Sequence, residues 1–174
     1  FFVPFAVVTV LYAIPFLSGF KSNLRSISYL KIIIVALVWA GVTVLLPLYS
    51  VQKTIVTLDV QLAFIQRFLL VAVLVLPFDI RDVQFDVISL QTIPRKIGIE
   101  QTKKLGYILL MISLVFEFVI VPNGTFRNVF LIVFCGVLFL LMRARVNQSK
   151  YYSSFWVEAI PIFWFLLLWA SLNF

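Results

Sequence analysis

Three aspartates lie close together where a long apolar stretch of this 174-residue chain ends: Asp79, Asp82 and Asp86. The whole chain has only 7 acidic residues, so three of them in one short segment form a distinct cluster. Residues at i, i+3 and i+7 share one face of a helix, where three carboxylates repel one another unless a cation neutralises them. Because carboxylate oxygens are ligands that Mg²⁺ prefers, the spacing predicts a magnesium site.

The composition places these acids in a membrane protein. Hydrophobic residues make up 63% of the chain and charged residues 12%, and the mean hydropathy is +1.13. Soluble domains are about half apolar and about one quarter charged. The apolar runs are continuous and do not alternate with polar residues, which favours helices over a β-barrel. We therefore predict an all-α integral membrane protein.

Six apolar runs are long enough to cross a bilayer as helices. They cover residues 2–18, 31–49, 61–78, 104–121, 126–142 and 155–172. The connections after the first, third and fifth runs lie on one side and carry eleven of the 14 basic residues: Lys21, Arg25, Lys31, Arg81, Arg95, Lys96, Lys103, Lys104, Arg143, Arg145 and Lys150. The positive-inside rule places this side, with the three aspartates, in the cytosol. This asymmetry accounts for most of the net charge of +7, which therefore requires no nucleic-acid partner.

Residues 79–103 form the most charged connection, and we interpret them as a cytosolic functional loop of one transmembrane domain that covers residues 1–174. Loops of this length usually carry function. Pro94 and Gly98 are both expected to stop helices, so that the chain turns here and enters the fourth span near Gln101. Acidic and basic groups in one loop suit an anionic substrate that is held through a metal.

Two charged residues lie inside apolar runs, nearer the non-cytosolic end: Arg67 and Glu117. A charge without a partner is costly in the hydrocarbon region of a membrane. We predict that they pair across neighbouring helices; the alternative is that each side chain snorkels to the membrane surface. Either arrangement is structural, because both residues lie on the wrong side of the membrane for chemistry at the three aspartates.

The acidic loop resembles the second aspartate-rich motif of UbiA-type intramembrane prenyltransferases. Asp82-Val-Gln-Phe-Asp86 is similar to the DxxxD element of that family, and Asp79 is an added upstream acid. Gln91-Thr-Ile-Pro94 is similar to the Thr/Ser-Leu-Pro-type segment that follows this element, and Gly98 to a later glycine.

The resemblance implies Mg²⁺-dependent transfer of a polyprenyl group from a prenyl diphosphate to a lipophilic, aromatic or quinone-type acceptor. It implies that Asp82 and Asp86 hold Mg²⁺ and that Asp79 assists. It further implies that the diphosphate is bound by Lys21, Arg25, Arg95 and Lys96, of which the first two follow Tyr12 in a pattern that is common in the family. Aromatic side chains, 17% of the chain, would shelter the developing carbocation. Such chemistry fits a bacterial inner (plasma) membrane or an organelle.

The resemblance covers this whole chain but only part of the family fold. That fold has nine transmembrane helices, and the six runs here would match helices four to nine. The family's first motif, of the Asn-Asp-x-x-Asp type, does not occur in the 174 residues, and Leu90 stands where many members have glycine. The chain also begins at Phe1 without a methionine. We therefore expect a fragment of a larger domain that is inactive by itself.

Two other functions remain open. The first is a non-catalytic UbiA-like subunit or scaffold in a larger complex, with another membrane protein as its partner. The second is a transporter or channel that uses the acids to bind ions. The sequence favours the transporter least, because the acids gather in a surface loop and no broken helix occurs near the membrane centre.

Overall fold

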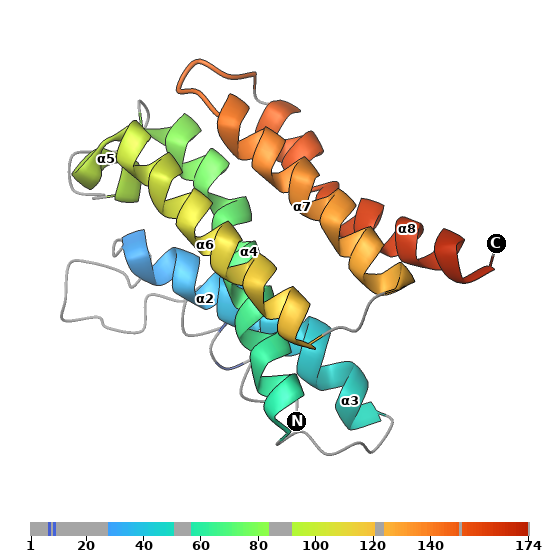
Figure 1. Cartoon of the computed structure of the whole chain (residues 1–174). Helices are drawn as coiled ribbons and strands as arrows, with labels where there is room; N and C mark the ends of the chain where they lie inside the picture. Colours follow the sequence, from blue (N-terminus) through green and yellow to red (C-terminus); the bar gives the residue numbers. More distant parts are fainter. Residues whose placement is uncertain are drawn as a thin grey trace.

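The computed structural model describes residues 7, 9, 28–50, 57–83, 92–120, 124–149 and 151–173. Every regular element in those ranges is helical, with no strand among them (Figure 1). The elements are α2 (Ser28–Ala40), η2 (Gly41–Leu45), α3 (Leu46–Ser50), α4 (Leu58–Asp82), α5 (Ile93–Ile97), α6 (Ile99–Ile120), α7 (Thr125–Arg143), η3 (Tyr152–Val157) and α8 (Ile160–Asn173). The predicted all-α class is confirmed for these ranges. Helices are expected in apolar runs of a membrane protein, because a helix satisfies its backbone polar groups within itself.

Among the described residues, four helical stretches are long and apolar enough to cross a membrane: Leu30–Ser50, Leu58–Asp82, Thr125–Arg143 and Tyr152–Asn173. They correspond to four of the six predicted spans. The predicted span 104–121 falls on α6, which has 22 residues and carries three charged residues on or beside its apolar run: Lys103, Lys104 and Glu117. The predicted span 2–18 lies outside the described residues, apart from two positions.

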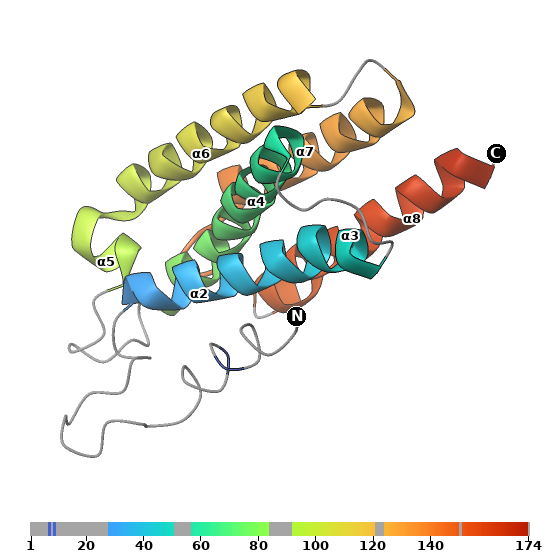
Figure 2. The ribbon, with the colours of Figure 1, turned by 90° about the horizontal axis from the view of Figure 1, so that it is seen from below.

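Prolines explain two irregular turns in the spans. α2, η2 and α3 follow one another without a break and form one rod, which Figure 2 shows from the side of α2 and α3. A proline has no N–H, and its ring clashes with the carbonyl four residues earlier. Pro47 stands four residues after Thr43 in the π-helical turn η2, and Pro161 four residues after Val157, the last residue of the π-helical turn η3. In both places the wider turn accommodates the ring.

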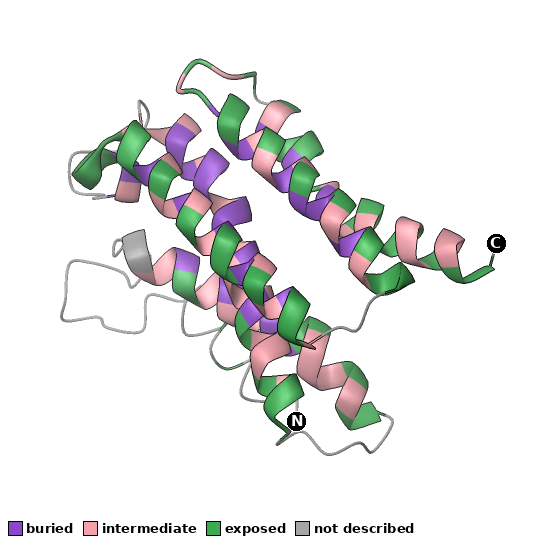
Figure 3. Cartoon of the chain, viewed as in Figure 1, coloured by how far each residue is buried: buried purple, intermediate pink, exposed green. Residues whose placement is uncertain are grey.

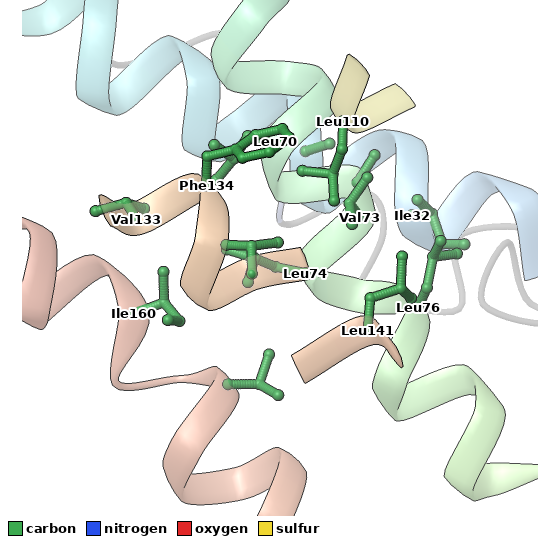
Figure 4. Packing of buried hydrophobic residues seen from close by; sticks show 14 of the residues in the cluster. Ile32, Leu70, Val73, Leu74, Leu76, Leu110, Val133, Phe134, Leu141 and Ile160 are labelled. Atoms are coloured by element: carbon green, nitrogen blue, oxygen red, sulfur yellow. The ribbon is translucent and has the colours of Figure 1, made fainter. Parts of the chain in front are cut away.

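α4 is the central helix, between the α2–α3 rod and the pair formed by α6 and α7 (Figures 1 and 2). In its most apolar part 44% of the residues are buried, against 11% in the stretch Tyr152–Asn173 at the edge. Figure 3 shows the buried residues on the faces that the helices turn toward one another. The core in Figure 4 includes Leu70, Val73 and Leu76 of α4, Leu110 of α6, and Val133 and Leu141 of α7. The outer faces expose large apolar side chains, as helices that face lipid do.

Gly106 lets α6 lie close to both α4 and α7. A Cβ atom at this position would lie 2.6 Å from Leu141 Cδ2 and 2.9 Å from Leu76 Cδ1, and both leucines are fully buried. We expect Gly106→Val to lower the free energy of unfolding by about 1–3 kcal/mol, because the core must shift to admit the side chain. Thermal unfolding in detergent measures this loss. Gly136→Val is the matched control, since its Cβ would meet only Ile160 Cδ1, at 3.6 Å. Equal melting temperatures for the two variants would contradict the close approach.

Candidate functional site

Several helix ends meet at one end of the bundle, which we call the charged end: the starts of α2, α6 and η3, the ends of α4 and α7, and α5. Lys31 on α2 contacts Asp79 on α4, and Lys103 Nζ on α6 donates a hydrogen bond to the carbonyl of Met142 on α7 at 3.1 Å. α5 packs against both α4 and α6. The charged end therefore contains the described part of the predicted functional loop.

Asp79 lies inside the bundle and is ion-paired. Its side chain is 1% exposed, and its Oδ1 accepts a hydrogen bond from Lys31 Nζ at 3.2 Å. The Lys31 side chain is 38% exposed, so it reaches the carboxylate from the rim. A buried carboxylate is costly unless a cation compensates its charge. Asp79 therefore joins α4 to α2, and its partner Lys31 was not among the predicted site residues.

Asp82 has a different environment, although it lies less than one turn beyond Asp79 on the same helix. It is the last residue of α4, and its side chain is 30% exposed. Its Oδ1 accepts a hydrogen bond from Arg81 Nε at 2.6 Å, while Arg81 Nη1 donates to Ser154 Oγ at 3.4 Å. The Asp82 carboxylate is thus accessible from solution. The Arg81 guanidinium beside it also contacts Ser154.

The donor chemistry of the charged end fits Mg²⁺ at Asp82 better than at Asp79. Both carboxylates offer the hard oxygen ligands that this ion prefers, but Asp79 is buried behind Lys31. Within the described ranges, no three acidic, histidine or cysteine side chains gather closely enough to hold a metal ion. Asp86, the natural third ligand by its spacing, lies outside those ranges. Asp82 together with Asp86 is therefore the pair to consider for a metal.

α5 presents Arg95 and Lys96 at the charged end, and both residues are exposed. Gly98 ends α5 with φ +85°, a left-handed conformation that favours glycine, and α6 begins at the next residue. The expectation that Gly98 stops a helix is therefore confirmed. The same expectation for Pro94 is wrong, because Pro94 lies in the first turn of α5, where a missing N–H costs nothing.

An open cavity of about 670 Å³ lies beside α5, between the start of α6 and the end of α7. Its charged lining residues are Glu100, Lys103 and Arg145. The two basic side chains make the cavity suitable for an anionic group. From the sequence, both residues can be placed only on the basic flank of the spans, because nothing in the order of residues shows that the start of α6 and the end of α7 face the same space.

Gln148, in the connection between α7 and η3, ties this connection to α4. Its Nε2 donates to the carbonyl of Pro77 at 2.8 Å and to Ser153 Oγ at 2.7 Å. Together with the contact between Arg81 and Ser154, these bonds hold the start of η3 against the last turns of α4. The charged end therefore holds several separate polar contacts that join helix ends at one end of an apolar bundle.

Arg67 and Glu117 attract each other electrostatically, as predicted, but each makes its direct contact with another residue. Glu117 is buried on α6, and its Oε2 accepts a hydrogen bond from Gln66 Nε2 at 2.6 Å. The Arg67 guanidinium lies over the ring of Trp164 on α8, 3.7 Å from its centroid, an attraction that is stronger away from water. Gln66 and Arg67 are neighbours on α4 and point in different directions: Gln66 faces α6, and Arg67 faces α8.

The described positions thus account for part of the predicted site. Asp79, Asp82, Arg95 and Lys96 lie at the charged end, whereas Lys21, Arg25 and Asp86 lie outside the described residues. The part of the chain that the structure describes is an all-helical membrane protein, with four helices in it that are long and apolar enough to cross a bilayer. Comparison with known protein families, with curated proteins and with solved structures gives no match. The residues of the charged end therefore provide the basis for a functional proposal.

Proposed function

We propose that this protein transfers a prenyl group from a prenyl diphosphate to a lipophilic, aromatic or quinone-type acceptor, with Mg²⁺, in the manner of UbiA-type enzymes. The observation that carries the proposal is the accessible carboxylate of Asp82 at the same end of the bundle as exposed Arg95 and Lys96 and as the cavity that Lys103 and Arg145 line. An acidic group that can hold a divalent cation and basic groups that can hold phosphate are the two parts that a diphosphate site requires.

The proposed chemistry places the reacting end of the substrate at the charged end. When the bond between the prenyl group and the diphosphate breaks, negative charge accumulates on the departing diphosphate, and bound Mg²⁺ would neutralise it. Asp82 and Asp86 would hold the ion. Arg95 and Lys96 would contact phosphate oxygens, as would Lys21 and Arg25. The prenyl chain would extend among the apolar helices, which exclude water from the carbocation-like centre.

A non-catalytic membrane subunit or scaffold is the second candidate, and one observation favours it. Asp79 is buried and joined to Lys31, so at least one of the three clustered acids stabilises the packing of α2 against α4. In a scaffold, Asp82 would likewise serve the network that contains Arg81 and Ser154, with no metal. The two candidates differ in whether Mg²⁺ promotes binding of a prenyl diphosphate.

Binding of an unreactive substrate analogue distinguishes the two candidates without knowledge of the acceptor. We expect the purified protein in lipid nanodiscs to bind farnesyl thiolodiphosphate in Mg²⁺, as measured by equilibrium dialysis, and to lose this binding in EDTA. Farnesol, which has the same apolar chain and no phosphate, is the matched control and should show no dependence on Mg²⁺. Equal binding of the thiolodiphosphate in Mg²⁺ and in EDTA by a folded protein would favour the scaffold.

A further inference from the structure

A second open groove lies between α7 and the η3–α8 segment, and it shares no lining residue with the cavity beside α5. Its volume is about 570 Å³, and its lining includes Gly136, Phe139, Arg143, Tyr152, Trp156 and Ala159. The small residues Gly136 and Ala159 leave the space open, and aromatic rings form its walls. The groove is therefore bounded by α7 and the η3–α8 segment and lined largely by aromatic side chains.

The groove must face lipid over most of its length. α7 and the stretch Tyr152–Asn173 are both long and apolar enough to cross a membrane, and the second of these has only 11% of its most apolar part buried. Phe139 and Trp156 are 55% and 60% exposed, respectively. Apolar rings that are this exposed on membrane-spanning helices contact hydrocarbon chains.

One end of the groove is positively charged. Arg143 is the last residue of α7, it is exposed, and its guanidinium carbon lies 5.6 Å from the centroid of the Phe139 ring. Tyr152, whose hydroxyl donates to the Leu140 carbonyl, and Trp156 lie at the same groove. Such amphipathic rings are enriched at the level of lipid headgroups. Glu158, the nearest acid along the chain, is not among the lining residues.

We propose that this groove binds one anionic phospholipid. The phosphate contacts the Arg143 guanidinium, and one acyl chain lies along the furrow toward Gly136, seven residues or about 10 Å away along the helix axis. An anionic lipid is favoured over a zwitterionic one, because a headgroup ammonium would lie close to Arg143 and Arg145 at this end. The site is separate from the proposed reaction and stands whether or not Asp82 holds a metal.

The test compares two arginines at opposite ends of α7. Arg127 also lies over an aromatic ring, 4.7 Å from the centroid of Phe118, so Arg127→Gln is a matched control for Arg143→Gln. Native mass spectrometry in detergent, with phosphatidylglycerol or phosphatidylcholine added, measures bound lipid. We expect the wild-type protein and Arg127→Gln to retain one phosphatidylglycerol in preference to phosphatidylcholine. Arg143→Gln should weaken phosphatidylglycerol binding about tenfold or more.

A second variant tests the apolar part of the groove without changing the charge at its end. Gly136→Leu fills the furrow and leaves Arg143 in place, and it should also weaken phosphatidylglycerol binding. Equal binding of the two lipids by the wild-type protein overturns the proposal, and so does unchanged binding in both Arg143→Gln and Gly136→Leu. Displacement of the lipid by an equimolar prenyl diphosphate also overturns it, because the groove would then belong to the substrate. Circular dichroism verifies that each variant is folded.

Discussion

In the full-length protein, Asp82→Asn is expected to slow Mg²⁺-dependent release of diphosphate about 100-fold or more. The substitution keeps the size of the side chain and removes the negative charge that would hold the metal. The fold should not change, because the Asp82 side chain is 30% exposed and Arg81 retains its contact with Ser154. The rate of diphosphate release from a labelled prenyl diphosphate, in native membranes that supply the acceptor, measures the effect.

The control for this prediction lies on the same helix. Asp59 is exposed in the first turn of α4, at the opposite end from Asp82. Asp59→Asn removes a favourable interaction with the helix dipole, at a cost below about 1 kcal/mol, and should leave the rate within about twofold of the wild type. If Asp82→Asn stays within a few-fold of the wild-type rate, Asp82 holds no metal. If both variants lose activity equally, the loss of activity results from destabilisation of α4 and not from loss of a metal ligand.

Lys31→Met is expected to lower the free energy of unfolding by about 2 kcal/mol. The substitution removes the cation that Asp79 Oδ1 contacts at 3.2 Å, while the carboxylate remains 1% exposed. The cost should be smaller than for a fully buried ion pair, because the Lys31 side chain is 38% exposed. Lys104→Met, an exposed site on α6, is the control and should change stability by less than about 0.5 kcal/mol. Chemical denaturation in mixed micelles measures both values.

The double variant Lys31→Met with Asp79→Leu decides whether the loss comes from the pair. An apolar pair of similar volume often replaces a buried ion pair without loss, so the double variant should be more stable than Lys31→Met alone. Additive losses would show that the two side chains are not coupled. The same variant also tests the role of Asp79: if diphosphate release persists in it, Asp79 is not a ligand of the metal.

The helices were predictable from the sequence because a membrane leaves the backbone few alternatives. Continuous apolar runs predict spans at 31–49, 61–78, 126–142 and 155–172, and each falls on a stretch that is long and apolar enough to cross. Prediction of α6 as a span was less direct, since three charged residues lie on or beside its apolar run. The first turn of α5 was misjudged because proline both ends helices and begins them, and only the surrounding chain decides which.

The partners of the charged residues could not be predicted, because they depend on how each helix is rotated about its axis. Two neighbouring residues of α4 illustrate this: Gln66 faces Glu117 on α6, and Arg67 faces Trp164 on α8. A rotation of about 100° separates adjacent residues of a helix, so a small error in rotation exchanges their partners. Lys31 and Asp79 are 48 positions apart, and their contact requires α2 and α4 to lie side by side in register.

The two bonds of Gln148 have a mechanical consequence. The amide links the carbonyl of Pro77 in α4 to Ser153 in η3, so η3 cannot move away from α4 without breaking hydrogen bonds beside an apolar bundle. Farther along α8, the Arg67 guanidinium of α4 lies over the Trp164 ring, a second specific contact between the two helices. The connection between α7 and η3 therefore anchors one end of this edge of the bundle to α4, at the end that carries Asp82.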